Sequence, residues 1–405
     1  MTEPLVKIQG LYKLFGENPK QVMSKVKAGE SKDKILADTG HTLGLKDINL
    51  EIQQGEIYVI MGLSGSGKST LIRHFNRLID PTEGVISIEG TDVMKLSPKE
   101  LQDFRRHKMS MVFQRFGLMP HRTVIENVAY GLTVQGVAKE QRLAKAQEWL
   151  DTVGLNGYAQ QYPAQLSGGQ QQRVGLARAL ATDAEILLMD EAFSALDPLI
   201  RSEMQDQLIE LQETLHKTII FITHDLDEAL RLGDKIAILK DGEVVQQGTP
   251  DDILLHPATD YVEAFVKDVN RARALTVETV MQPPARRITA DTICEALQQM
   301  KKIKGDYAYH VTDDGYQGIV TQDALEEASI HKAGEQLESC EYQDVPTVSP
   351  DAIIESVLTE SLETEFSLPV VDEDGNLKGE LTRSSVAEVF AEPETEEETA
   401  SAASK

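Results

Sequence analysis

Residues 57–80 read IYVIMGLSGSGKSTLIRHFNRLID, and this stretch decides the fold. Its apolar start, Ile57 to Met61, predicts a short buried strand, and the glycine-rich turn that follows matches the pattern G-x-x-x-x-G-K-[ST]. Apolar residues after the turn fall at helical spacing, and Pro81 is expected to end that helix. These helix positions are Leu71, Ile72, Phe75, Leu78 and Ile79. Strand, glycine loop and helix in this order predict a phosphate-binding loop rather than a chance glycine-rich turn.

The loop supplies the groups that hold the phosphates of a nucleotide. Its glycines let successive backbone N–H groups point inward, and the helix N-terminus adds partial positive charge. Lys68 can reach the β- and γ-phosphates, and the Ser69 hydroxyl can ligate Mg²⁺. The predicted nucleotide contacts in the loop are Gly62, Ser64, Gly65, Ser66, Gly67, Lys68, Ser69 and Thr70.

A second pair of residues supplies the chemistry that a phosphate loop lacks. The apolar run Ile186 to Met189 predicts a buried strand, and Asp190 ends it. Asp190 is expected to hold Mg²⁺ through water, and Glu191 to polarise the attacking water as general base. The alternative is that both acids cap a helix, which Lys68 and Ser69 upstream disfavour.

Composition limits the partners. The 405 residues carry a formal net charge of −26, and residues 271–405 hold 28 acidic against 11 basic side chains. This balance argues against a nucleic-acid protein, which needs a basic face, and against unaided adhesion to an anionic membrane. Solubility alone could also explain the acidity. Two cysteines make no disulfide framework and fit a reducing cytoplasm.

No membrane segment is predicted. The first residues, MTEPLVKIQG, lack a basic and then apolar signal pattern, and no apolar run approaches the ~20 residues of a membrane span. If the protein acts at a membrane, we expect another chain to hold it there.

The order of predicted elements indicates two domains. In residues 1–270 strands alternate with helices, which predicts an α/β fold, and residues 97–181 read mainly as helix. Residues 17–42 are polar and predicted helical with a break near Gly29. Asp241-Gly242 predicts a hairpin between two further strands.

Residues 271–390 form a second predicted α/β domain that contains an internal repeat. Val311-Thr-Asp-Asp-Gly315 resembles Val371-Asp-Glu-Asp-Gly375, and each copy reads as helix, two strands and a short helix. The copies span about 276–330 and 343–390 and predict two modules packed face to face. Residues 391–405 are acidic and predicted disordered, with a role as a salt sensor left open.

The segment LSGGQQQR at 166–173 predicts a second anion-binding helix end. Its residues Ser167, Gly168, Gly169 and Gln170 open a helix that is expected to run to Ala181. Two phosphate-binding helix ends far apart in one chain indicate head-to-tail pairing of two copies. The Ser167 end of one copy would then close over the Lys68 loop of the other.

These motifs resemble the nucleotide-binding subunits of ATP-binding-cassette (ABC) transporters over residues 5–255. The family order is present in the phosphate loop, Gln114 in MVFQRFG, LSGGQ, the Asp190-Glu191 pair, Ser194-Ala-Leu-Asp197, and His224 in FITHD. The resemblance implies a P-loop NTPase fold with a helical subdomain, and ATP and Mg²⁺ as cofactors. It also implies that Gln114 senses the γ-phosphate and Mg²⁺, and that His224 holds the γ-phosphate and the attacking water. By the same resemblance, Asp197 shapes the contact between the two cassettes, and Phe15 stacks on adenine.

A narrower resemblance comes from the 17–42 insertion between two strands and from the C-terminal repeat. Together they are similar to the ATP-binding subunit of glycine betaine/proline importers, which carries paired cystathionine-β-synthase-type (CBS) modules. This implies ATP hydrolysis that powers osmoprotectant import at the cytoplasmic face of the cell membrane. It implies transmembrane permease subunits docking near Phe116–His121, with Phe116, Leu118 and Met119 as the apolar contacts or as ordinary core. An extracellular substrate-binding protein would take part indirectly.

The CBS modules lack the usual ribose signature. In many modules of this kind, a Thr and an Asp three residues later bind an adenosine ribose. Here Thr321 is followed by Asp323, one position too early, and Thr382 is followed by Arg383-Ser384-Ser385, without an Asp. Binding of a nucleotide such as a cyclic dinucleotide, sensing of ionic strength, and simple dimerisation all stay open for the modules.

Two other functions compete with an importer subunit. A soluble cassette ATPase acting on ribosomes or nucleic acid is disfavoured by the single motif set, the absence of sustained heptads and the negative charge. A regulator with a vestigial ATPase is disfavoured by the intact Glu191 and His224.

Overall fold

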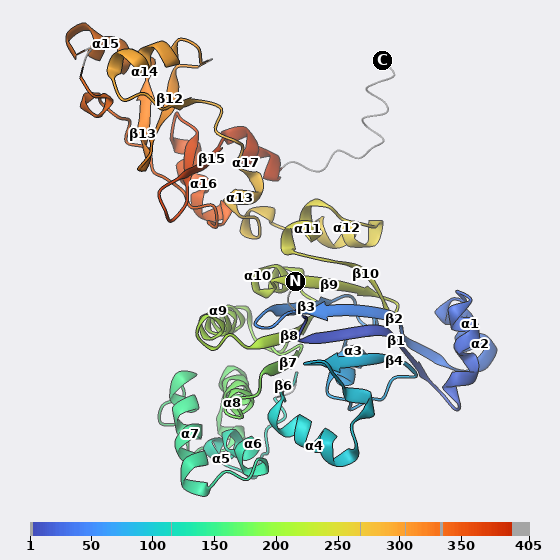
Figure 1. The fold of residues 1–405 in the computed structure, drawn as a ribbon. Helices are drawn as coiled ribbons and strands as arrows, with labels where there is room; N and C mark the ends of the chain where they lie inside the picture. The colour runs from blue at the N-terminus through green and yellow to red at the C-terminus, as the bar shows by residue number, and fades with distance from the viewer. Residues whose placement is uncertain (1–2, 115, 268, 304, 333–334, 391–405) are drawn as a thin grey trace. The chain divides into compact units, whose positions relative to one another are not determined.

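The computed structural model describes residues 3–114, 116–267, 269–303, 305–332 and 335–390 (Figure 1). It divides into two compact units, Met1–Val269 and Asn270–Lys405. The predicted acidic tail, 391–405, lies outside the described residues.

A six-stranded sheet forms the centre of the first unit, with the strand order β10-β9-β3-β8-β7-β6. The strands are β3 (Ile57–Met61), β6 (Met109–Val112), β7 (Ile186–Asp190), β8 (Thr218–Thr223), β9 (Lys235–Lys240) and β10 (Glu243–Gly248). All neighbours pair in parallel except β9 and β10, which form the predicted hairpin. Because parallel strands end at one edge, the residues after β3, β6, β7 and β8 lie side by side there.

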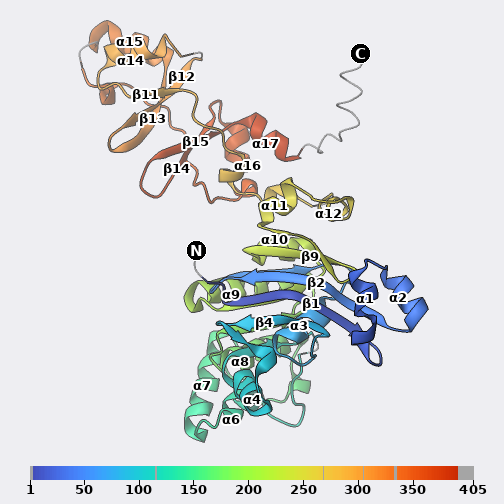
Figure 2. The same cartoon turned by 45° about the vertical axis from the view of Figure 1, so that its right-hand side comes forward.

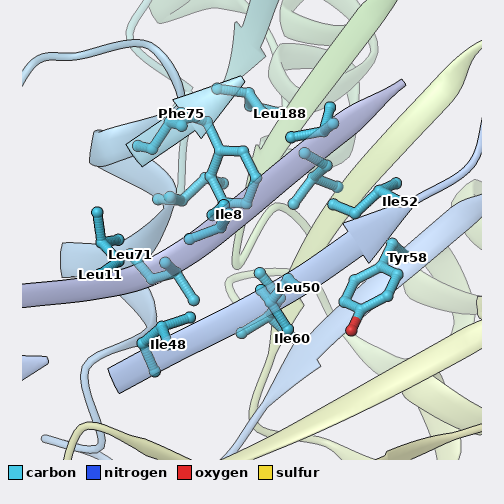
Figure 3. Close-up of a cluster of buried hydrophobic side chains, with 14 of the residues drawn as sticks. Ile8, Leu11, Ile48, Leu50, Ile52, Tyr58, Ile60, Leu71, Phe75 and Leu188 are labelled. Carbon is cyan, nitrogen blue, oxygen red and sulfur yellow. The ribbon is translucent and has the colours of Figure 1, made fainter. Parts of the chain in front are cut away.

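A second, antiparallel sheet has the order β2-β1-β4-β5. Its strands are β1 (Val6–Phe15), β2 (Thr42–Ile52), β4 (Glu83–Ile88) and β5 (Thr91–Asp92). Helix α3 (Lys68–Phe75) packs against it, and Figure 3 shows Leu71 and Phe75 among Ile8, Leu11 and Leu188 in one buried cluster. This core fixes the start of α3, and with it the phosphate loop, between the two sheets.

Helix α3 ends earlier than the sequence predicts. It stops at Phe75, Arg77 has a φ of 51°, and Leu78 is 57% exposed instead of continuing the apolar stripe. The cause is tertiary: Arg105 donates to the carbonyl oxygens of Asn76 and Arg77 at 2.8 and 2.6 Å. These bonds hold the cap residue Asn76 and the next residue, Arg77, from another element, and so fix the turn that ends the helix.

The helical subdomain has a core of its own, built by Val128, Leu150 and Val174 with their neighbours. It comprises α5 (Val124–Val128), α6 (Tyr130–Val134), α7 (Lys139–Thr152), the 3₁₀ turn η3 (Pro163–Gln165) and α8 (Gly168–Leu180). Helix α4 (Pro98–His107) instead packs with Leu101 and Phe104 against the core between the two sheets. The prediction of residues 97–181 as mainly helix missed β6, because four residues show no periodicity by themselves. Its ladder to β7, from Met109↔Ile186 to Val112↔Met189, makes it a strand.

The predicted break in the insertion is confirmed. Gly29 has a φ of 83° between α1 (Met23–Lys27), which follows the 3₁₀ turn η1 (Pro19–Val22), and α2 (Lys32–Thr39). Four further helices complete the unit, with the 3₁₀ turn η2 (Val93–Lys95) before α4. They are α9 (Pro198–Leu215), α10 (Leu226–Leu232), α11 (Pro250–Leu255) and α12 (Asp260–Val266).

The second unit repeats one order of elements, as the sequence predicts. The first copy is β11 (Arg287–Ile288), α14 (Ile293–Met300), β12 (Tyr307–Thr312), β13 (Gly315–Thr321) and α15 (Gln322–Lys332). The second is α16 (Ile354–Glu363), β14 (Leu368–Val371), β15 (Leu377–Leu381) and α17 (Arg383–Phe390). The connecting elements are η4 (Arg271–Arg273), α13 (Val277–Val280) and η5 (Leu337–Ser339).

The two copies touch at their repeated turns. The N–H of Tyr316 donates to the Gly375 carbonyl at 2.8 Å, and a Cβ on Gly315 would lie 2.4 Å from the same oxygen. Gly315 has a φ of 103°, so only glycine fits this contact without strain. The first of the repeated glycines therefore serves the packing of one module on the other.

Candidate functional site

The phosphate loop curls around its own lysine. Lys68 is only 5% exposed, and its Nζ donates to the carbonyl oxygens of Gly62 at 2.7 Å and Leu63 at 3.2 Å. A Cβ on Gly62 would lie 2.2 Å from the Leu239 carbonyl oxygen, so glycine is required there. Burial lowers the pKa of Lys68, and the nearby Glu191 and Asp190 carboxylates oppose that shift.

One polar atom of the loop is buried without a partner. Ser66 is buried, and its Oγ has no hydrogen-bond partner within the described ranges. A buried hydroxyl without a partner is costly, so this atom is suited to a ligand in the loop. A phosphate oxygen is an acceptor of the right kind for it.

Oxygen ligands for a hard cation converge beside the loop. The Ser69 hydroxyl donates to Asp190 Oδ1 at 3.3 Å, from the start of α3 to the end of β7. Burial raises the pKa of Asp190, while Arg73 and the Ser69 hydroxyl lower it. A hydroxyl and a carboxylate fit Mg²⁺, which prefers oxygen ligands and keeps several waters. Among the described residues, no three His, Cys, Asp or Glu side chains are grouped so that they could hold a metal ion by themselves.

Glu191, at the end of β7, contacts residues that follow three other strands. Its Oε2 accepts from Gln114 Nε2 at 3.0 Å and lies 3.5 Å from His224 Nδ1, while its Oε1 lies 3.9 Å from Lys68 Nζ. These partners follow β6, β8 and β3, and Glu191 follows β7. The φ of Glu191 is 46°, a conformation that non-glycine residues hold only when the surroundings determine it. A water beside this carboxylate would have a base and donors within reach.

A pocket of about 270 Å³ joins the loop to Phe15. Phe15 is 40% exposed at the end of β1, and Lys13 Nζ lies 5.0 Å from its ring centroid. A Cβ on Gly44 would lie 2.8 Å from Phe15 Cε2, so the glycine lets the ring sit where it does. The pocket is lined by Phe15, Lys32, Thr42, Leu43, Gly44, Ser64, Gly65, Gly67, Lys68, Ser69, Thr70 and Glu191. Four of these residues are absent from the predicted site, and no local motif marks them: Lys32, Thr42, Leu43 and Gly44.

The LSGGQ residues lie outside this pocket. Ser167 caps α8, because its Oγ accepts from Gln170 N at 3.3 Å and Gln170 Oε1 accepts from Ser167 N at 2.9 Å. Gly169 packs against α9, where a Cβ would lie 2.6 Å from Ile200 Cγ2. Asp197 caps α9 by accepting from Ile200 N at 3.2 Å. Within one chain, Ser167, Gly168, Gly169, Gln170 and Asp197 are therefore not brought to the phosphate loop.

Arg178 holds the segment after Gln114 against α8. Its guanidinium donates to the carbonyl oxygens of Gly117 at 2.6 Å and Phe116 at 3.0 Å, and burial lowers its pKa. Phe116 has a φ of 55°, so these bonds stabilise an unusual turn. Sequence reasoning missed Arg178, whose only signal is a lone arginine in the apolar stretch VGLARALA.

A groove of about 590 Å³ lies between α4, β6, α6 and α8. Of the three apolar residues predicted for docking, only Met119 lines it. Leu118 packs against the helical core, and Phe116 is half-buried. The alternative that some are ordinary core is thus correct for Leu118. The exposed apolar surface comes instead from Phe113, Tyr130 and Val134.

The helix caps of the second unit use the hydroxyls of the partial ribose signature. Thr321 Oγ1 accepts from Ala324 N at 3.2 Å, and Thr382 Oγ1 accepts from Ser385 N at 3.0 Å. Beside them, buried Glu380 accepts from Tyr309 Oη at 2.8 Å and Arg286 Nη2 at 3.2 Å. Both threonines therefore have a structural role.

Comparison with known proteins places this geometry in a family. The model of the ABC transporter family matches residues 45–194, and that of the CBS domain matches residues 341–392. The chain is 49% identical over 383 residues to the glycine betaine/carnitine transport ATP-binding protein of Listeria monocytogenes, covering 94% of this chain and 96% of that one. It is 45% identical over 387 residues to the glycine betaine/proline betaine transport system ATP-binding protein of Salmonella typhimurium, covering 93% and 95%.

Solved structures show the same cassette. An ATP-binding cassette solved as a dimer in a post-hydrolysis state with ADP and phosphate is 36% identical, with a TM-score of 0.51. The match covers 60% of this chain and 98% of the solved chain. Among the described residues, no helix is both long enough and apolar enough to cross a membrane.

Proposed function

The chain belongs to the ABC transporter family, as one of its ATP-binding subunits, and on that basis we propose that it powers the import of glycine betaine or a related quaternary amine or proline. The subunit binds ATP and hydrolyses it to ADP and phosphate. The relatives that are 45–49% identical transport glycine betaine with carnitine or proline betaine, which supports this class of cargo.

The contacts of Glu191 carry the assignment of the hydrolytic centre. Its carboxylate accepts the proton of the attacking water, and Gln114 and His224 hold that water and the γ-phosphate beside it. Lys68 and the loop N–H groups offset phosphate charge. Ser69, Asp190 and Gln114 would hold Mg²⁺, which neutralises charge on the phosphates when bound.

Two copies form the working ATPase. The separation of Ser167 and Asp197 from the Lys68 loop within one chain supports a site completed by a second copy. The similar cassette solved as a dimer gives further support. In this arrangement the α8 N-terminus of one copy covers the ATP held by the loop of the other.

Permease subunits dock in the groove beside β6. Phe113, Tyr130 and Val134 expose apolar surface there, and Arg178, which also lines the groove, donates to Gly117 in the segment after Gln114. A permease helix in the groove would contact the segment that carries Gln114. Such docking places the subunit at the cytoplasmic face of the membrane, with a substrate-binding protein on the other side.

The CBS modules regulate this ATPase through ionic strength or a nucleotide ligand. Helix α12, the last helix before the second unit, reaches the phosphate loop: Leu63 N donates to Tyr261 Oη at 3.4 Å. The segment that leads to the modules therefore contacts the catalytic loop.

The test is ATP-driven uptake by vesicles that contain the permease and this subunit, with labelled glycine betaine, proline, carnitine and choline compared. We expect ATP-dependent accumulation of at least one of them, with a Glu191→Gln subunit as the inactive control. ATP hydrolysis without uptake of any would reject the cargo, and stimulation by nucleic acid or ribosomes would favour a soluble cassette ATPase. Salt dependence that survives removal of residues 276–405 would reject the sensor role.

A further inference from the structure

The 17–42 insertion reaches the nucleotide pocket. It joins β1 to β2, and both ribbon views place α1 and α2 beside the ends of these strands (Figure 1; Figure 2). Lys32, the first residue of α2, lines the pocket together with Phe15 and the phosphate loop. The insertion is therefore part of the nucleotide site.

A small core fixes the position of α2. Ile35 of α2 and Val26 of α1 are buried against Leu14 of β1 and Leu43 of β2. Ser31 caps α2 by accepting from Lys34 N at 3.3 Å. Because Leu43 also lines the pocket, the core that holds α2 is continuous with the pocket wall.

Polar contacts close the insertion at both ends. His41 Nε2 lies 2.7 Å from the Glu17 carbonyl oxygen, and its Nδ1 lies 2.9 Å from that of Thr39. Lys27 pairs with Glu83 of β4 at 2.6 Å. Lys32 thus projects from a closed, anchored segment rather than from a free loop.

The charge of Lys32 is left without a counter-charge. Three other lysines of the insertion pair with carboxylates: Lys25 with Asp38, Lys27 with Glu83 and Lys34 with Glu30. Lys32 is half-buried, yet it has no hydrogen-bond or ion-pair partner in the part of the chain that the structure describes. A lysine that lines a pocket and lacks a counter-charge there favours an anionic ligand.

We propose that Lys32 binds the α-phosphate of ATP, so that the insertion supplies a phosphate contact to the cassette. This rests on the proposed ATP site, with the base on Phe15 and the terminal phosphates at Lys68. Adenine is uncharged, so the anionic group nearest to it is the α-phosphate, which a lysine from the β1–β2 connection can hold. ATP and ADP share this phosphate, and both should feel the contact.

The test is equilibrium binding of ATP and ADP by the full chain, with the steady-state constants of hydrolysis. We expect Lys32→Gln to weaken both nucleotides about five- to tenfold, the scale of one partly exposed hydrogen bond between charged groups. The value of kcat at saturating ATP should stay within about twofold, and Lys32→Arg should restore binding. Lys34→Gln, on the same helix but paired with Glu30, is the matched control and should bind like the wild type.

The outcomes separate this inference from the site itself. Unchanged ATP affinity in Lys32→Gln, an equal loss in Lys34→Gln, or a loss for ATP but not ADP would each overturn the α-phosphate contact. Failure of the wild type to bind ATP would reject the proposed ATP site instead. Rising salt should shrink the difference between wild type and Lys32→Gln, because ions screen an exposed charge pair.

Discussion

The side-chain amide of Gln114 donates to the Glu191 carboxylate across 3.0 Å, although 77 positions separate the two residues in the chain. Parallel pairing of β6 with β7 produces this contact, because it brings the ends of both strands to one edge. The segment that borders the proposed permease groove is thus bonded to the proposed general base itself.

Replacing Glu191 by glutamine should abolish hydrolysis while nucleotide binding remains. The amide keeps the shape and a partner for Gln114 but cannot accept a proton from water. We expect kcat to fall about 10²- to 10⁴-fold, the usual contribution of a general base, in a phosphate-release assay. Glu148→Gln, at an exposed position of α7, is the control. Unchanged hydrolysis in Glu191→Gln would remove the residue from the catalytic role.

Phe15 should hold the adenine base of ATP by stacking. Phe15→Leu removes the ring and should weaken ATP binding by about 1–3 kcal/mol, the contribution of one base–aromatic stack, whereas Phe15→Tyr should bind like the wild type. Isothermal titration of ATP measures both. Phe113→Leu, an equally exposed phenylalanine in the groove, is the control. If Phe15→Leu binds ATP with wild-type affinity, adenine does not stack on Phe15.

Arg178→Lys should slow hydrolysis without affecting ATP affinity. Lysine keeps the charge but cannot bond the Phe116 and Gly117 carbonyls in the same fork, so Gln114 loses its fixed position. We expect kcat to fall at least about tenfold, equivalent to one hydrogen bond to a charged group, with KM unchanged. Arg142→Lys, which loses a bond to Val137 O in the same subdomain, serves as control. A rise in KM at constant kcat would contradict this role of Arg178 in positioning Gln114.

Asp190→Asn should stabilise the nucleotide-free protein and inactivate it. Burial raises the pKa of Asp190, so its ionised form opposes folding at neutral pH, and this opposition fades as pH falls through the raised pKa. The amide still accepts from Ser69. We expect a higher Tm than wild type at neutral pH, and a difference that shrinks toward acid pH. Mg²⁺ with ATP should raise the Tm of the wild type more than that of the variant. A lower Tm for Asp190→Asn at neutral pH would contradict this account.

A charge in the groove should uncouple transport from hydrolysis. Val134→Glu places a carboxylate on the proposed permease surface and should reduce uptake by vesicles at least about tenfold, because an unpaired charge would be buried at the interface. Basal ATPase activity of the free subunit should not change. Val85→Glu, at a similarly exposed valine on β4, is the control. Normal uptake by Val134→Glu would place the docking surface outside the groove.

Local patterns predicted the elements well where one element determined its own form. The strand Ile57–Met61 and the break at Gly29 follow from apolar runs and from glycine. The end of α3 does not follow from a local pattern, because Arg105 from another helix bonds the carbonyls of Asn76 and Arg77. The sequence leaves Leu118 open between a docking contact and ordinary core, and its packing against the helical core decides for the second.

The sequence alone determined the residues of the phosphate loop, the acids after β7 and the order of the family motifs, because each works through neighbours a few positions away. Only the tertiary structure decided that Lys32 of an insertion lines the proposed nucleotide pocket, that Arg178 bonds the segment after Gln114, and that Ser167 lies away from Lys68. These are contacts between distant segments, fixed by the pairing of parallel strands and by the packing of separate cores, and no local spacing encodes them.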